Sequence, residues 1–310
     1  MVNKLEWLFN IINIPLSYIL NFFAGIMNNS FAAAVFVFTL FINLAMIPLS
    51  IKSQKSSVGQ MRVKPKLDEL KKKYGDDKQR YSQEMQKLYQ EENISMSGGC
   101  LPMLIRLPIM LSIYYLITRP LTYLMGIGKD TITKLAETLE LKGNNTNVEL
   151  SIIDAVSKDN GLSAEIASKL DTVDFTLWGM DLTQTPKFSF DFTKAELIWI
   201  IPFMAFAAQM LTSIVSMRMQ KKINPDAPSM TGMMLTMPLI SLFIGFGVPA
   251  GVGFYWACSS LISGGIQTFI QYFYGPQRML ASERAKEIIK VYEDEQKYIN
   301  KRVADDATEE

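Results

Sequence analysis

The sequence contains no histidine and has only two cysteines, Cys100 and Cys258, which lie far apart. A zinc site, cysteine–histidine catalysis and a disulfide framework are therefore excluded. The long apolar segments contain no aspartate or glutamate, and the chain has no Walker motif. An intramembrane peptidase and a nucleotide-driven pump thus lack the residues that they need. We expect a protein that is not an enzyme and that has no cofactor and no metal site.

Hydrophobic residues make up 49% of the 310-residue chain and are gathered into long blocks, with the charges between them. A membrane span needs about 20 mostly apolar residues. The last block is long enough for two crossings, and a cluster of glycines and Pro249 near its middle favours a tight turn. The pattern predicts an all-α membrane protein with a bundle of five transmembrane helices, at 31–51, 98–125, 197–217, 232–247 and 249–273.

The segments outside these spans are also assigned. They are an N-terminal interfacial amphipathic helix at 1–30, a cytosolic helical hairpin at 52–97, a small α-rich extracellular insert at 126–196, a cytosolic loop at 218–231 and a cytosolic tail at 274–310. The first 30 residues lack the basic start and the cleavage site of a signal peptide. Asn10, Asn13, Pro15 and Asn21 interrupt their apolar run, which favours a helix lying on the membrane over a sixth span.

The orientation follows from the basic residues, which mark the cytosolic side. They are concentrated in 52–97, 218–231 and 274–310, whereas 126–196 has 12 Asp and Glu against 7 lysines. The N-terminus is therefore expected outside and the C-terminus in the cytosol. Within the insert, 130–141 and 162–173 have the pattern of short amphipathic helices. The hairpin at 52–97 is either the mobile element that receives another molecule or a solvated pair of helices without such a task.

Polar side chains recur at a similar depth in the predicted spans. At the rise of an α-helix, Arg106 lies about 8 Å from the cytosolic end of its span. Four other polar residues lie roughly 6–12 Å from the cytosolic ends of their own spans. They are Asn43, Gln209, Thr236 and Gln267. An arginine at such depth costs about 2.5–3.5 kcal/mol, and no acidic residue in a span can neutralise it. We expect a hydrated cavity that is open to the cytosol. The alternatives are that Arg106 snorkels to the inner surface and that the other residues are packing contacts between helices.

Four stretches of the chain resemble signature segments of the YidC/Oxa/Alb membrane-protein insertase family. They are "INLAMIPLSIKSQKS" at 42–56, "GGCLPMLIRLPIMLSIYYLI" at 98–117, "FTLWGMDLTQTP" at 175–186 and "PAGVGFYWACSSLISGGIQ" at 249–267. The resemblance implies a bacterial, multi-pass plasma-membrane protein, similar to the Gram-positive type but without a lipoprotein signal. It also implies insertion and folding of client transmembrane proteins, without ATP, through a positively charged groove open to cytosol and lipid.

The resemblance also implies the site and its partners. The client-binding groove would be formed by Arg106, Asn43, Gln209, Gln267, Thr236, Trp256 and Ser260. Nascent membrane proteins and the lipid bilayer are the implied partners, together with the Sec translocon and the ribosome, with no nucleic-acid specificity and a monomeric state. The competing interpretation is a small secondary transporter or channel for an anionic solute, which would use the same arginine.

Two features depart from the family pattern. Bacterial members usually have an arginine in the first core span, where this chain has Asn43, and an uncharged residue where this chain has Arg106. We therefore expect Arg106 to reach into the same cavity, with Asn43 as its neighbour and hydrogen-bond partner. The extracellular insert is also longer than in Gram-positive relatives, and the acidic end of the tail predicts weak attraction to ribosomal RNA.

Overall fold

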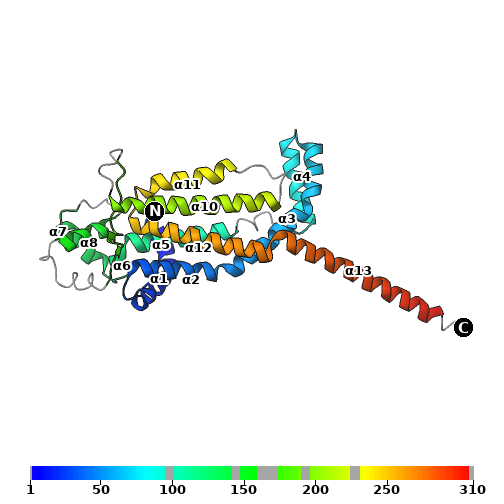
Figure 1. The fold of residues 1–310 in the computed structure, drawn as a ribbon, viewed down its shortest axis with the longest axis horizontal. Coiled ribbons are helices and arrows are strands. Elements are labelled where there is room, and N and C mark those ends of the chain that lie inside the picture. The colour runs from blue at the N-terminus through cyan, green and yellow to red at the C-terminus, as the bar shows by residue number, and fades with distance from the viewer. Residues whose placement is uncertain are drawn as a thin grey trace. The chain divides into compact units, whose positions relative to one another are not determined.

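The computed structural model describes residues 2–94, 101–141, 147–158, 173–189, 196–223 and 231–306 of the chain, and these are mostly helical (Figure 1). The chain divides into two compact units. The first unit comprises residues 1–47 and 103–268, and the second comprises residues 48–102 and 269–310. All of the predicted groove residues belong to the first unit.

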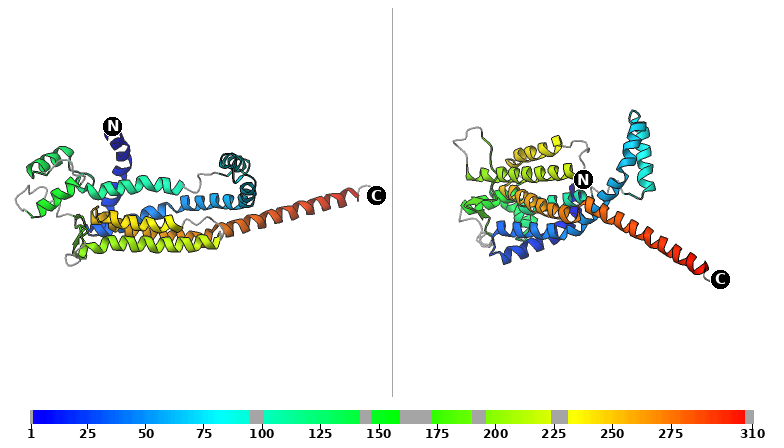
Figure 2. Two further views of the ribbon diagram at one scale, coloured as in Figure 1. Left: turned by 90° about the horizontal axis from the view of Figure 1, so that it is seen from above. Right: turned by 45° about the vertical axis from the view of Figure 1, so that its right-hand side comes forward.

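The first unit is built from helices of very different length. They are α1 (Val2–Ile26), α2 (Phe31–Ala45), α5 (Leu101–Thr118), α6 (Pro120–Tyr123), α7 (Lys129–Thr138), α8 (Val148–Lys158), α10 (Ile200–Ile223), α11 (Thr231–Gly245) and α12 (Ala250–Tyr274). A 3-10 turn, η2 (Leu197–Trp199), precedes α10, and a small antiparallel hairpin joins β1 (Thr176–Leu177) to β2 (Met180–Asp181). The helices α2, α5, α10, α11 and α12 run along a common direction, and α1 crosses that direction (Figures 1 and 2).

Local sequence explains where several helices begin and end. The side chain of Ser30 caps α2 by accepting a hydrogen bond from Ala33 N. Pro48 lies just past the end of α2 and lacks an N–H donor, which accounts for a 41° bend between Phe31–Ala45 and Ile47–Gln54. Pro120 lies just past the end of α5, so this helix ends at Thr118, inside the predicted span at 98–125, and the short helix α6 follows.

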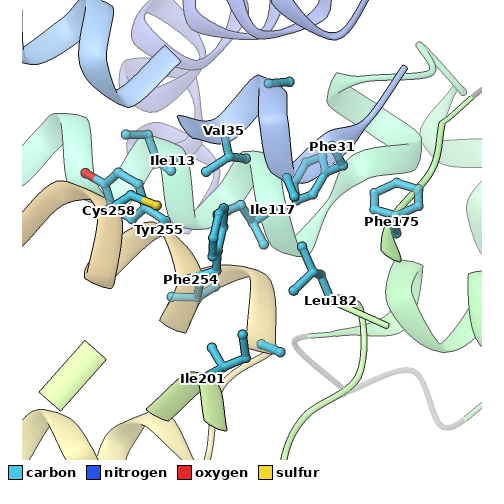
Figure 3. Close-up of a cluster of buried hydrophobic side chains, with 14 of the residues drawn as sticks. Phe31, Val35, Ile113, Ile117, Phe175, Leu182, Ile201, Phe254, Tyr255 and Cys258 are labelled. Atoms are coloured by element: carbon cyan, nitrogen blue, oxygen red, sulfur yellow. The ribbon is translucent and has the colours of Figure 1, made fainter. Parts of the chain in front are cut away.

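A large apolar cluster holds the first unit together (Figure 3). Its buried side chains come from α1, α2, α5, α10, α12 and the β hairpin, and include Phe31, Val35, Ile113, Ile117, Leu182, Ile201 and Phe254. Gly251 lets α12 start close to this cluster, because a Cβ there would lie 3.1 Å from Ile117 Cγ2. The backbone N–H groups of Ala250 and Gly251 donate to carbonyls of the loop after β2, which satisfies the start of α12.

Hydropathy and length single out fewer spans than the sequence pattern predicts. Among the described residues, Leu197–Met219 alone is long and apolar enough to cross a membrane, and the bent pair formed by α2 and the start of α3 passes the same test together. Three shorter apolar helices are also present: Asn10–Ile26, Leu107–Thr118 and Met234–Gly245. The arrangement of five spans therefore stays a prediction.

The extracellular insert of the sequence prediction has its own small core. One face of α7 and one face of α8 meet there around buried Leu135, Leu150 and Ile152. The amphipathic pattern at 130–141 corresponds to α7. The helix α8 and the β hairpin were not predicted, and the second expected helix, at 162–173, lies outside the described residues except for its last position.

The second unit contains a helical hairpin and a long helix. Its elements are α3 (Ile47–Tyr74), α4 (Lys78–Glu91), the end of α12 and α13 (Pro276–Asp306). Asp77 caps α4 by accepting from Arg80 N at 3.0 Å. Glu92, just after α4, forms ion pairs with Arg62 and Lys66 on α3, so the two arms of the hairpin are tied at that end.

Candidate functional site

The polar residues of α2 lie on its buried face. Asn43 is 8% exposed, and its Nδ2 donates to the carbonyl oxygen of Thr39 at 2.8 Å. Thr39 is 1% exposed and donates from Oγ1 to the carbonyl oxygen of Val35 at 2.6 Å. Each side chain thus bonds the carbonyl one turn earlier, which is how polar groups are commonly satisfied within an apolar bundle. The sequence analysis singled out Asn43 but not Thr39, whose carbonyl oxygen accepts the hydrogen bond from Asn43.

Gln209 connects two helices of the bundle. Its Oε1 accepts a hydrogen bond from Ser241 Oγ at 2.8 Å, which joins α10 to α11. Ser241 Oγ also lies 2.8 Å from the carbonyl oxygen of Pro238. Interhelical bonds of this kind contribute about 0.6 kcal/mol on average in membranes. Gln209 is therefore hydrogen-bonded to Ser241, which is not one of the predicted groove residues.

The predicted residues of α11 and α12 differ in exposure. Thr236 is exposed, whereas Trp256, Ser260 and Gln267 are half-buried. Trp256 packs against the main apolar cluster and against the smaller cluster of Ala205, Ala208 and Ala257.

Small residues allow α12 to lie close to α10. A Cβ at Gly253 would lie 2.9 Å from Ile201 Cγ2, and a Cβ at Gly264 would lie 2.3 Å from Thr212 Cγ2. Ala257 is buried between these two glycines in sequence and clusters with alanines of α10. Ser260 follows Ala257 by three positions and precedes Gly264 by four, so it shares their helical face. Its register thus places Ser260 along the contact between the two helices.

Arg106 lies in the first turns of α5, where the structure describes the helix but not the side chains. The predicted contact between Arg106 and Asn43 therefore falls outside the described side chains. The helical register is nonetheless clear, because residues four and seven positions further on share the face of position 106. Those residues are Met110 and Ile113, and both pack into the main apolar cluster.

The structure adds a buried polar group that the sequence analysis did not single out. Ser112 on α5 is fully buried, and its Oγ has no hydrogen-bond partner within the described part of the chain. A single serine in an apolar run carries no signal by itself, because most such hydroxyls bond a carbonyl of their own helix. Among the described residues, no cluster of three or more acidic or cysteine side chains could hold a metal ion.

The helices of the first unit expose large apolar side chains. On α11 these are Met237, Leu239, Ile240, Phe243 and Ile244, which are 45–72% exposed. Similar side chains are exposed on α2 and α10, including Phe36, Phe41, Phe203 and Leu211. Contiguous apolar surfaces of this extent are typical of sites that face lipid or a protein partner. The bundle thus exposes many large apolar side chains, while Thr39, Asn43 and Ser112 are buried within it.

A buried carboxylate lies at the junction of α6 and α8. Glu149 is 7% exposed, and its two oxygens accept from the backbone N and the Oγ1 of Thr122 at 3.0 and 2.6 Å. Burial raises the pKa of the Glu149 carboxyl, and the Thr122 hydrogen bonds oppose that shift. The contact therefore binds the end of the α5–α6 segment to the insert.

The chain was compared with known families and proteins. A family model described as 60Kd inner membrane protein matches residues 22–277. "Membrane protein insertase YidC" of Marinobacter nauticus is 29% identical over 266 residues, which is 85% of this chain and 35% of that protein. The proteins of the same name from Dechloromonas aromatica and Rickettsia conorii are 29% and 27% identical over 74% and 82% of this chain. The matched region spans about a third of these relatives, between 30% and 38% of their length.

The matched residues include α2, the hairpin, all of the bundle helices and every predicted groove residue. The resemblance noted in the sequence is thereby confirmed at the level of the family. Because the family model matches well over half of the residues of this chain, the chain belongs to the 60Kd inner membrane protein family.

Proposed function

We propose that this chain is an insertase of the bacterial inner membrane, which helps client transmembrane segments to enter the bilayer and fold there. The observation that carries the proposal is the family match over residues 22–277, together with relatives named as insertases. The exposed apolar faces of α2, α10 and α11 support a location in lipid. Hydrophobic transfer of the client drives the net reaction, so the mechanism needs no nucleotide.

The proposed topology has five spans, with the N-terminus outside and the C-terminus in the cytosol. The basic hairpin α3–α4 then lies in the cytosol, and α7 and α8 lie outside. The charge asymmetry of the sequence supports this orientation. The crossing direction of α1 (Figure 2) supports a helix that lies along the outer surface of the membrane.

The proposed groove is centred on Arg106. Met110 and Ile113 share its helical face and pack into the bundle, which supports an arginine directed toward the interior rather than toward acyl chains. An interior guanidinium without an acidic partner in the spans requires water. Asn43 on α2 and Gln209 on α10 are the polar neighbours that we assign to this wet region.

A wet, positive cavity would lower the barrier for polar client segments. An acidic segment that crosses the membrane loses hydration over about 30 Å of hydrocarbon. A cavity in the inner half of the bilayer shortens the dry path, and Arg106 offers the client carboxylates a transient partner. The apolar part of the client leaves sideways along the lipid-exposed helix faces.

The Sec translocon and the ribosome are proposed partners, and the working state is proposed to be a monomer.

The decisive variant is Arg106→Gln, assayed by insertion of a single-span client with an acidic tail into vesicles that contain the purified chain. We expect insertion to fall at least about fivefold, because roughly 1 kcal/mol of lost charge stabilisation corresponds to that change in rate. The matched control is Arg284→Gln, an exposed arginine of α13. Equal insertion by both variants would show that Arg106 has no part in the reaction.

A second variant tests whether the arginine has been relocated. Arg106→Gln combined with Asn43→Arg returns the charge to the helix where bacterial relatives usually carry it. We expect the double variant to regain most of the lost insertion. A double variant no better than the single one would refute relocation, and uptake of a small anion without client insertion would favour the transporter.

A further inference from the structure

The structure contains a cavity that the proposed insertion mechanism does not use. It has a volume of about 490 Å³ and lies between one face of α1 and the segment from Thr122 to Lys129. The wall from α1 comprises Asn10, Ile14, Ser17, Tyr18 and Asn21, which recur at helical spacing. Both walls belong to the first unit, so their relative position is part of one compact body.

Three hydrogen bonds hold the two walls together. Asn13 Nδ2 donates to the hydroxyl of Tyr123 at 3.1 Å, and that hydroxyl donates to Asn10 Oδ1 at 2.9 Å. Asn21 Nδ2 donates to the carbonyl oxygen of Leu124 at 3.1 Å. These bonds join residues more than 100 positions apart in sequence. The cavity is thus preformed, as most binding sites for small ligands are.

The chemistry of the lining favours an anion. Lys129 is the charged residue among the described lining residues, and none of them is acidic. The wall also includes Asn10 and Tyr18, whose amide and hydroxyl groups can donate hydrogen bonds. An ammonium and neutral donors around a cavity of this size suit a phosphate group better than a cation or an uncharged solute.

The surroundings favour a ligand that also has an apolar part. The stripe of α1 next to the cavity exposes Ile11, Ile14, Tyr18 and Phe22 by 48–74%. The opposite side of α1 is buried in the bundle through Leu16, Leu20 and Ala24. An exposed apolar stripe beside a polar cavity is the arrangement expected where a helix lies between head groups and acyl chains.

We propose that this cavity binds the phosphodiester head group of an anionic glycerophospholipid of the outer leaflet. Lys129 and the donors of α1 hold the phosphate, and the acyl chains lie along Ile14 and Phe22. The lipid would fasten α1 to the bundle at the membrane surface. The assignment of the leaflet rests on the proposed membrane topology, whereas the anion chemistry rests on the cavity itself.

The test uses the full chain, purified and reconstituted with phosphatidylglycerol, and counts the lipids that it retains by native mass spectrometry. We expect the wild type to retain one phosphatidylglycerol and Lys129→Gln to lose at least about five-sixths of that occupancy. Lys134→Gln is the control, because it removes an exposed lysine of the same helix outside the cavity. Equal retention by the two variants would overturn the proposal.

Two further experiments distinguish a bound lipid from a bound soluble anion. Ile14→Ser should weaken retention of the lipid and leave the folded helix content unchanged. Millimolar inorganic phosphate should not displace the lipid, and full displacement would show that the site takes a soluble anion instead. Insertion is measured on the same vesicles with Arg106→Gln. Normal insertion by that variant would contradict the proposed function while leaving the lipid result standing.

Discussion

Asn43 and Gln209 show two ways in which an amide is accommodated inside an apolar bundle. The side chain of Asn43 bonds a carbonyl of its own helix, at Thr39. Gln209 accepts from Ser241 on the next helix, so its contact stabilises the pairing of α10 with α11. The first bond lies within one helix, and the second contributes to packing between helices.

Glu149 provides a residue-level prediction about pH. Its folded pKa is raised by burial, so the folded chain holds this proton more tightly than the unfolded chain. The stability of the contact with Thr122 is then greatest below the ordinary pKa of glutamate and falls as the pH rises through the raised pKa. Hydrogen exchange of α8 should thus show less protection at pH 7 than at pH 4, after correction for intrinsic exchange.

Glu149→Gln should remove this dependence, because the amide keeps an oxygen for Thr122 N and does not ionise. The control is Glu137→Gln, which alters an exposed carboxylate of α7. It should retain the pH dependence of the wild type. Protection of wild-type α8 that rises with pH would contradict the assigned direction of the shift.

At the level of elements, α10 and α12 approach each other closely at Gly264. Gly264 faces Thr212, with only 2.3 Å from an added Cβ to Thr212 Cγ2 and 3.0 Å to Thr212 Cβ. Rotation of the threonine side chain moves Cγ2 but not Cβ, so an added methyl group must push the helices apart. Small residues at such a contact allow van der Waals packing between backbones in a membrane.

Gly264→Ala should therefore destabilise the bundle by about 1–3 kcal/mol, as overpacking usually does. Gly265→Ala is a neighbouring control, since nothing lies within 4 Å of its added Cβ. Thermal unfolding in micelles would compare the two variants. Equal midpoints would mean that α10 and α12 do not approach each other in the folded protein as closely as the structure shows.

The hairpin α3–α4 depends on weaker forces. Its tie consists of Glu92 with Arg62 and Lys66, on an exposed surface where such ion pairs contribute little. The Lys66 hydrogen bond lowers the pKa of Glu92, so the tie is present above the ordinary glutamate pKa and is lost as the pH falls through the lowered value. Among the described side chains of the hairpin, the buried apolar ones are Val58, Val63 and Leu88. Such an element suits a mobile role next to a client.

For the whole molecule, the proposed topology can be tested by cysteine labelling. In a background with Cys100→Ser and Cys258→Ala, an impermeant maleimide should label Lys134→Cys on α7 in intact cells. It should label Lys71→Cys on α3 only after the membrane is permeabilised. Both positions are exposed, so accessibility within the fold does not limit the reaction. The reverse pattern would place the basic hairpin outside and would contradict the orientation inferred from charge.

Much of this architecture follows from local properties of the chain. Long apolar runs predict helices, and Pro48, Ser30 and Asp77 mark helix boundaries, because these effects act over a few residues. The end of α5 at Thr118 was not expected, since the apolar pattern continues past Pro120. No helix was assigned to 148–158, although the insert as a whole was expected to be α-rich.

The contacts between distant segments could not be predicted in this way. Gln209 is hydrogen-bonded to Ser241 and Tyr123 to Asn10, and Gly264 packs against Thr212. The residues of each pair are at least 32 positions apart in sequence. Periodicity shows which face of a helix is apolar but not which neighbour covers it, and the rotation of each helix about its axis depends on the packing of all the others. Helix type and helix ends are thus local properties that can be predicted from the sequence. The pairing of faces, and with it the cavity beside α1, is a collective result of packing.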